Sequence, residues 1–239
     1  MKRVYVFVLT LLMSGSMCFP KHISDQIHKT NTEDIDDYRF SVDLNGGIYI
    51  NNNAAWILEP SVTWNFYKYI GVNIALEFTS EYNQPRPGIS IDGWHGDLNK
   101  NYTNVGWVIL KPGLVFKTPS FLKSREGNRK LWLQAEPGVS LACPFHNSVV
   151  YDIQGYQGNT STTIAYKKFR NEDLQWFYWQ GKVSINFSID RFVFGGGYGI
   201  SNFDYYSCRR NIKLPDGRKF QVPEREMSHS VFLSVGYNF

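Results

Sequence analysis

From residue 38 onward the chain alternates apolar and polar residues with a period of two, which predicts β-strands rather than helices. The composition, with 16% aromatics and 20 glycines, also points to a chain of many strands. The chain therefore reads as all-β. The expected strands are residues 38–50, 54–66, 69–81, 104–117, 131–145, 173–189, 191–204 and 228–239.

The two faces of these expected strands differ in the size of their side chains. In the second segment Leu58, Val62 and Trp64 share one face, and Glu59 and Ser61 lie on the other. A soluble sandwich normally has a wet face rich in Lys and Glu. The polar face here holds mainly Gly, Ala, Ser, Thr and Asn, which suit a crowded interior, so we expect the bulky face to meet lipid.

The connections between the expected strands alternate between short and long. Residues 67–68 and residue 190 form short links, and the long links are residues 82–103, 146–172 and 205–227. Short periplasmic turns and long outer loops are typical of transmembrane barrels. The pattern predicts an eight-stranded antiparallel up-and-down transmembrane β-barrel in the bacterial outer membrane, although the short outer turn 51–53 and the long inner link 118–129 depart from the rule.

A soluble lipocalin-like barrel is the alternative, and it would place Trp64, Ile74 and Val183 inside. The positions of the aromatic residues bear on this choice, because membrane barrels carry aromatic girdles at both interfaces, although ordinary core packing accounts for any single ring equally well. Aromatics near expected inner ends are Tyr38, Phe66, Tyr67, Tyr69, Trp132, Phe187, Phe192, Tyr237 and Phe239, and those near outer ends are Trp56, Phe78, Trp107, Trp176 and Trp179.

The N-terminal region has the layout of an export signal. Lys2 and Arg3 precede an apolar run that is too short to span a bilayer as a helix, so residues 1–20 are predicted to be a signal peptide. Residues 21–37 are polar and predict a flexible leader, and residues 38–239 form the barrel domain. Removal of Lys2 and Arg3 lowers the net charge from +4 to +2, which gives no support to nucleic-acid binding.

The last expected strand, SVFLSVGYNF, resembles the C-terminal signature strand of bacterial outer-membrane β-barrel proteins. The stretches FVFGGGYGISNF and LWLQAEPGVSLA look like small outer-membrane barrels of Bacteroidetes-type bacteria. The resemblance implies that the barrel-assembly machinery engages the terminal strand, and that outer-membrane lipid and lipopolysaccharide surround the wall. The residues that carry this assembly signal are Val231, Leu233, Val235, Tyr237 and Phe239.

Three expected strands carry a charged residue followed by proline at their centres, namely Glu59–Pro60, Lys111–Pro112 and Glu136–Pro137. On the strand parity the charges point into the lumen and the prolines face lipid, where each requires a bulge or a missing ladder hydrogen bond. A belt of charges that pairs across the lumen is expected, because an unpaired buried charge is destabilising. Its residues are Asp43, Glu59, Glu77, Lys111, Glu136 and Lys182.

The candidates for chemistry lie in or near the long outer links. His95, His146 and His229 are weak catalytic candidates, because no nucleophile motif or metal-ligand spacing accompanies them. Cys143 and Cys208 both fall on the outer side, where a disulfide is plausible. The mixture of Tyr, Trp, Asn, Gln and Gly in the loops suits binding of an unidentified extracellular ligand, and equally suits ordinary wet loops. No metal or other cofactor is expected.

These features predict a structural or surface-interaction protein with a filled polar lumen, because a barrel of eight strands is just wide enough to be filled by its own side chains. Two functions of other classes stay open. One is an enzyme at the outer rim, a hydrolase or acyltransferase that modifies lipid A, and the other is a narrow porin-like ion-conducting pore.

Overall fold

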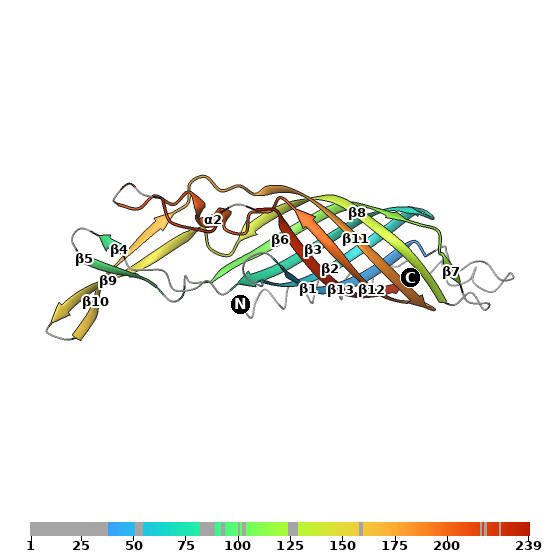
Figure 1. Cartoon of the computed structure of the whole chain (residues 1–239), viewed down its shortest axis with the longest axis horizontal. Helices are drawn as coiled ribbons and strands as arrows, with labels where there is room; N and C mark the ends of the chain where they lie inside the picture. Colours follow the sequence, from blue (N-terminus) through green and yellow to red (C-terminus); the bar gives the residue numbers. More distant parts are fainter. Residues whose placement is uncertain are drawn as a thin grey trace, which may run out of the picture. The chain divides into compact units, whose positions relative to one another are not determined.

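The computed structural model describes residues 38–50, 55–81, 89–91, 94–99, 101, 104–123, 129–157, 160–215, 217, 219–224 and 226–239 (Figure 1). The signal peptide and the leader, residues 1–37, lie outside the described residues. Among the described residues, no helix has the length and apolar character needed to cross a membrane.

Eight long strands form a closed antiparallel barrel, as the alternation predicted (Figure 1). The sheet runs in the order β11-β12-β13-β1-β2-β3-β6-β8, and the pairing of β11 with β8 closes it. The two-residue strand β7 (Leu122–Lys123) adds to the inner end of β8. The barrel strands are β1 (Phe40–Tyr49), β2 (Ala55–Tyr67), β3 (Ile70–Glu81), β6 (Val105–Lys117), β8 (Arg129–Pro144), β11 (Phe177–Ile189), β12 (Phe192–Ser201) and β13 (Ser228–Asn238).

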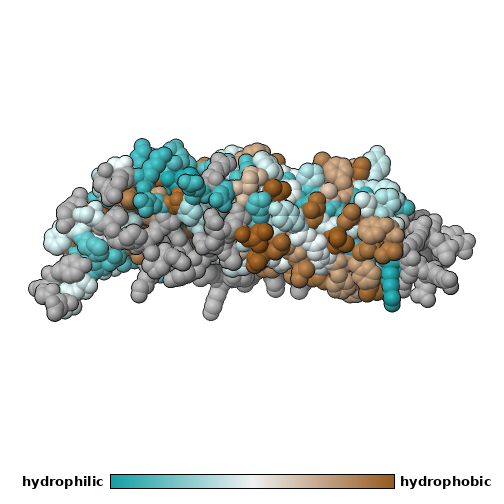
Figure 2. Space-filling model, in the orientation of Figure 1, coloured by the Kyte–Doolittle hydropathy of each residue, from teal (hydrophilic) through white to brown (hydrophobic). Residues whose placement is uncertain are grey.

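The bulky face of the wall points outward and the small polar face points inward. In β2 the exposed side chains Leu58, Val62 and Trp64 alternate with the buried Ser61 and Thr63. Hydrophobic residues accordingly cover the outside of the barrel strands, whereas hydrophilic residues gather over the outer segments (Figure 2). The orientation predicted from side-chain size is confirmed, and the lipocalin-like alternative is wrong.

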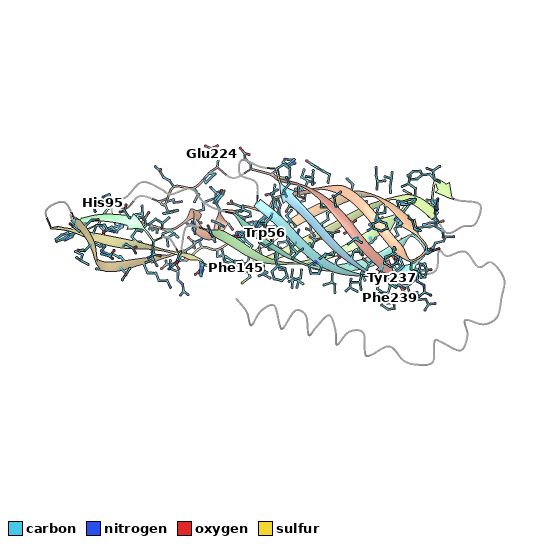
Figure 3. All side chains as sticks on the ribbon, turned by 90° about the horizontal axis from the view of Figure 1, so that it is seen from below. Trp56, His95, Phe145, Glu224, Tyr237 and Phe239 are labelled. Carbon is cyan, nitrogen blue, oxygen red and sulfur yellow. The ribbon has the colours of Figure 1, made fainter. Side chains whose placement is uncertain are left out.

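Most of the aromatic girdle follows the prediction. Trp56 lies outside near the outer end of the wall, and Tyr237 and Phe239 lie at the inner end (Figure 3). Two tryptophans differ from the expectation. Trp107 is completely buried inside the outer mouth, and Trp132 lines a small interior cavity, because each shares the parity of the lumen-facing residues on its strand.

The three charge–proline pairs coincide with gaps in strand pairing, without a bulge. The β2–β3 ladder stops at Leu58↔Phe78 and resumes in the same register at Ser61↔Ala75, which skips Pro60. The β6–β8 ladder likewise skips Pro112 and Pro137. A missing ladder hydrogen bond is the expected consequence of a residue without an N–H group.

Two of the long outer links, residues 82–103 and 146–172, are not simple loops, contrary to the expectation. Their described residues form a second, four-stranded antiparallel sheet in the order β10-β9-β5-β4. Its strands are β4 (Ile89–Ile91), β5 (Trp94–Leu98), β9 (Ser148–Gln157) and β10 (Thr160–Arg170). We call this the outer sheet; it lies at the end of the barrel opposite the C-terminus (Figure 1).

Candidate functional site

Four charged side chains from four barrel strands meet in the lumen. Lys111 Nζ on β6 donates a hydrogen bond to Glu59 Oε2 on β2 at 3.0 Å, and it also pairs with Glu77 on β3. Lys182 on β11 pairs with Glu59 from the other side. We call these four residues the lumen cluster. Two carboxylates and two ammonium groups balance in charge, which makes their burial tolerable.

Neutral side chains complete the hydrogen bonding of the lumen cluster. The Tyr49 hydroxyl donates to Glu77 Oε1 at 2.7 Å, and the Asn45 amide donates to Glu59 Oε1 at 2.9 Å. Both carboxylates are almost fully buried, with 1% of each residue exposed. Hydrogen bonds to charged groups are among the stronger ones in proteins, so this network fixes the relative positions of the facing strands.

The other two residues of the predicted belt, Asp43 and Glu136, also lie inside, around a cavity of about 30 Å³. Asp43 accepts a hydrogen bond from Ser41 at 3.1 Å, and Glu136 accepts one from Gln134 at 2.7 Å. The carboxylate of Asp43 occupies the space left by Gly236, its partner across the strand pair, where a Cβ atom would overlap it. A cavity of this size holds one or two water molecules and is not a channel.

The outer mouth is filled by the segment that follows β12, residues 202–212, which we call the plug. Its central ring, Phe203, contacts Trp107 and Tyr178 edge-on, with ring centroids 5.2 and 5.1 Å apart. The plug also contains the helical turn α2 (Ser207–Arg210). The buried core shared by plug and wall comprises Tyr49, Ala55, Ile57, Val105, Trp107, Ile109, Ala142, Tyr178, Phe203, Tyr205, Tyr206 and Cys208.

Hydrogen bonds attach the plug to the wall strands. Trp107 donates its indole N–H to the Tyr205 carbonyl at 2.8 Å, and the Tyr205 hydroxyl donates to the Val105 carbonyl at 3.1 Å. The Tyr178 hydroxyl donates to Ser207 Oγ at 2.8 Å. Because these bonds join the plug to β6 and β11, the plug is part of the barrel core.

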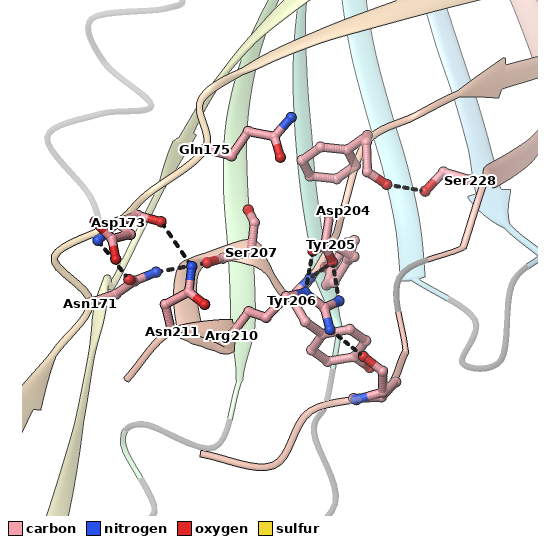
Figure 4. Close-up of polar contacts among 12 residues, drawn as sticks. Asn171, Asp173, Gln175, Asp204, Tyr205, Tyr206, Ser207, Arg210, Asn211 and Ser228 are labelled. Atoms are coloured by element: carbon pink, nitrogen blue, oxygen red, sulfur yellow. Dashed lines mark hydrogen bonds and ion pairs between the residues drawn. The ribbon is translucent and has the colours of Figure 1, made fainter. Parts of the chain in front are cut away.

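An ion pair and an amide hold the turns of the plug itself (Figure 4). Arg210 donates to both carboxylate oxygens of Asp204, at 2.6 and 2.7 Å, and this pairing raises the pKa of Arg210 above its usual value. The Asn171 amide donates to the Ser207 carbonyl at 2.7 Å, which ties α2 to the end of β10. A bidentate arginine–carboxylate pair has a defined geometry, so it favours one conformation of the plug.

The same chain segment continues from the plug onto the outer sheet. Ile212 and Phe220 are buried against Ile91, Val149 and Tyr151 of that sheet. Val222 packs against this second core and against the plug core. The long link after β12 therefore joins the barrel mouth to the outer sheet through continuous hydrophobic contact.

The three candidate histidines lie on three separate elements. His95 is on β5 of the outer sheet, where its Nε2 lies 3.1 Å from Asp97 Oδ1, and both side chains are exposed. His146 is exposed in the link between β8 and β9, and His229 on β13 contacts the Tyr198 hydroxyl. The described residues contain no group of three or more His, Cys, Asp or Glu side chains placed to hold a metal ion.

A disulfide between Cys143 and Cys208 is plausible from the sequence, but in the structure both cysteines are free thiols. Cys143 is exposed, since it has the outward parity on β8, and Cys208 is buried in the plug. Burial raises the pKa of the Cys208 thiol to about 12.

The terminal strand β13 presents Val231, Leu233 and Val235 outward, in the alternation on which the assembly signal rests. At its inner end the ring of Tyr237 contacts Phe192 and Phe239, with centroids 5.2 and 5.0 Å apart. The strand pairs with β12 on one side and β1 on the other. Recognition of this strand by the assembly machinery stays a prediction.

Sequence reasoning missed the plug and the outer sheet. The plug had one visible signal, the run NFDYYSCRR at residues 202–210, which is unusually aromatic for a wet loop. The outer-sheet strands are interrupted by glycines and by the polar run TSTT at residues 160–163, which weakens their alternation.

No protein-family model and no curated protein matches the chain. Solved structures of small outer-membrane barrels are similar to it. Ail of Yersinia pestis is 10% identical with a TM-score of 0.37, and the match covers 84% of this chain and 98% of Ail. Neisserial surface protein A is 8% identical with a TM-score of 0.40, covering 84% and 96%. The N-terminal barrel domain of Pseudomonas aeruginosa OprF is 9% identical with a TM-score of 0.36, again covering 84% and 96%.

At these identities the likeness concerns the fold alone, and the barrel itself is established by its own strand pairing. The more specific resemblance to Bacteroidetes-type barrels stays a prediction.

Proposed function

We propose that this chain is an outer-membrane protein whose barrel anchors the outer sheet at the cell surface without conducting ions, so that the sheet binds an extracellular ligand. The single observation that supports this function best is the segment of residues 202–222. It fills the barrel mouth at Phe203 and covers one face of the outer sheet at Ile212 and Phe220.

The outward apolar belt supports the membrane assignment. Side chains such as Leu58, Ile74 and Val183 are exposed around the wall, and hydrocarbon is the solvent in which such a belt is stable. Lipid and lipopolysaccharide contact this belt, and the barrel-assembly machinery engages β13.

The filled lumen supports the non-conducting assignment. The plug closes the outer mouth, the lumen cluster crosses the middle, and a cavity of about 70 Å³ beside Lys68 and Asp190 marks the inner end. Conduction requires a continuous water-filled path. In planar bilayers the purified protein should show no discrete conductance steps, and regular steps would overturn this part of the proposal.

We assign no catalytic activity to the outer rim. In the described part of the chain the three candidate histidines lie on separate elements, so no site is shared among them. Alanine at His95, His146 and His229 should leave the lipid A of the host unchanged by mass spectrometry, and an altered lipid would favour the rim enzyme.

Surface labelling of intact cells tests the orientation. In a Cys143→Ala background, Thr162→Cys on β10 should react with a membrane-impermeant maleimide, because the outer sheet lies outside. Lys68→Cys in the turn between β2 and β3 is the matched control, since that turn lies at the inner end and should react only after permeabilisation. Equal labelling of both positions on intact cells would contradict the proposal.

A further inference from the structure

The outer sheet has two edges of very different length. On one side it ends at β4, which has three residues, and on the other it ends at β10, which has eleven. The barrel has no open edge, apart from the two-residue β7. Among the described strands, β10 is therefore the long one whose outer edge carries no partner strand. Such an edge is a template for pairing with another chain.

The side chains of β10 are exposed as well as its edge. All residues from Thr160 to Tyr166 are exposed, and Ile164 and Tyr166 keep 54% and 71% of their surface. The strand contains no Pro or Gly. A bulge between Thr163 and Ala165 is its one irregularity against β9. The strand therefore offers both backbone groups and apolar contacts to an added strand.

The charge of β10 has a single sign. Its ionisable residues apart from Tyr166 are Lys167, Lys168 and Arg170, and it contains no acidic residue. Asp97 and Asp152 lie on the inner strands β5 and β9. A centred antiparallel pair of two β10 strands would set these cations opposite the threonine end of the other copy, residues 160–163, so self-pairing offers them no acidic partner. The same charges favour an acidic partner.

The strand is also held in place before any partner arrives. β10 pairs with β9 along its length, and the ring of Phe169 contacts Tyr151 with centroids 6.1 Å apart. Tyr151 belongs to the core that the segment after the plug covers. A pre-ordered edge lowers the entropy lost on association.

We propose that β10 accepts an extended acidic segment of another protein as a fifth strand of the outer sheet. The inference rests on the proposed function, because it requires the outer sheet to face the medium. Backbone hydrogen bonds along the edge supply affinity, and the cations at the end of β10 supply selectivity.

The test uses the purified full-length barrel in lipid nanodiscs and a fluorescent ten-residue peptide of alternating threonine and glutamate, with binding followed by anisotropy. The same peptide with lysine in place of glutamate should bind at least tenfold more weakly. The glutamate peptide N-methylated at its six central amides should also bind at least tenfold more weakly, because methylated amides cannot donate hydrogen bonds to the edge of β10.

Variants of the protein locate the binding. Lys168→Glu with Arg170→Glu should lower affinity for the acidic peptide at least tenfold and raise affinity for the lysine peptide. The matched control is Lys213→Glu with Lys219→Glu, two exposed lysines outside β10, and it should leave both affinities within twofold.

Each alternative outcome has a distinct meaning. Equal binding of the methylated and unmethylated peptides would replace strand addition by simple charge attraction, as for an acidic polysaccharide, and would overturn the inference. A dimer at micromolar concentration that β10 substitutions dissociate would overturn it in favour of a second copy. If Thr162→Cys is labelled on intact cells but no acidic peptide binds, this inference fails while the proposed function stands.

Discussion

The barrel wall and the outer sheet are both antiparallel and both alternate in polarity, yet they bury opposite kinds of side chain. In the wall Ile74 is 59% exposed while Glu77, three residues along the same strand, is 1% exposed. In the outer sheet Val149 and Tyr151 are buried, whereas polar residues such as Thr162 lie outside. One chain thus follows two opposite packing rules.

The difference teaches that alternation shows which residues share a face but not which face is inside. The composition of the polar face distinguishes the two cases. Small hydroxyl and amide residues fit a narrow closed lumen, as Ser61 and Asn73 do, whereas lysines and long polar residues such as Lys168 extend into water. The same residue type should therefore respond differently to substitution in the wall and in the outer sheet.

The largest effect is expected from removing a lysine. Lys111→Met should lower the free energy of unfolding by about 3 to 5 kcal/mol, because it leaves Glu59 and Glu77 buried with fewer charge partners. Lys168→Met on the exposed β10 is the control and should change it by less than about 0.5 kcal/mol. Urea-induced unfolding in phospholipid vesicles, followed by tryptophan fluorescence, measures both. Equal effects of the two substitutions would show that the lumen cluster is dispensable for stability.

The next largest effect is expected from placing an arginine on each exposed surface, because the barrel wall faces lipid and the outer sheet faces water. Ile74 and Ile164 are similarly exposed, at 59% and 54%. Ile74→Arg should destabilise the barrel in vesicles by about 2 to 4 kcal/mol, since an arginine would then face hydrocarbon. Ile164→Arg should cost less than about 0.5 kcal/mol. If the two isoleucines tolerate arginine equally in the same vesicle assay, the wall does not lie in a bilayer.

A smaller effect is expected from single tyrosine hydroxyls. Tyr49→Phe removes the donor to Glu77 and should destabilise by about 1.5 to 3 kcal/mol, the range for hydrogen bonds to charged groups. Tyr166→Phe on β10, where the ring is exposed, should be neutral within about 0.5 kcal/mol. Thermal unfolding of both variants in vesicles gives the comparison, and a neutral Tyr49→Phe would mean that Glu77 finds another donor.

The smallest effect concerns thiol reactivity and leaves stability untouched. In the folded protein Cys143 should react with maleimide, whereas Cys208 should not, because it is buried and its pKa is raised to about 12. At a pH below this raised pKa little of the thiol is ionised to the reactive thiolate. Raising the pH from 7 to 9 should therefore not make Cys208 react with maleimide. Mass spectrometry after unfolding should show both residues modified, and early modification of Cys208 would indicate that the plug opens.

The wall could be predicted from the sequence because its signals are local. In β2, 13 residues of alternation fix the strand and the residues that share a face, and the composition of the polar face then indicates which face is inside. The same parity also accounts for the positions of Cys143 and Trp107. On β8 Glu136 points inward, so Cys143 must point outward, and on β6 Lys111 shares its face with Trp107.

The plug and the outer sheet could not be predicted because they depend on contacts between distant segments. Phe203 is buried by Trp107 and Tyr178, which come from other strands and have no sequence relation to it. The outer sheet joins β5 to β9 across the whole of β6 and β8. Its short segments alternate too briefly to distinguish strands from polar loops.

The first and last strands of the barrel, β1 and β13, pair with each other from Ser41↔Asn238 to Tyr49↔Ser230. Seven strands would leave two rows of unpaired backbone groups, which hydrocarbon does not tolerate, and the eighth satisfies both rows in one step. The barrel wall is consequently expected to form cooperatively, as a closed ring of eight strands or not at all. We expect β1 to lack its second partner strand during membrane insertion until β13, the strand that ends in Tyr237 and Asn238, pairs with it and closes the barrel.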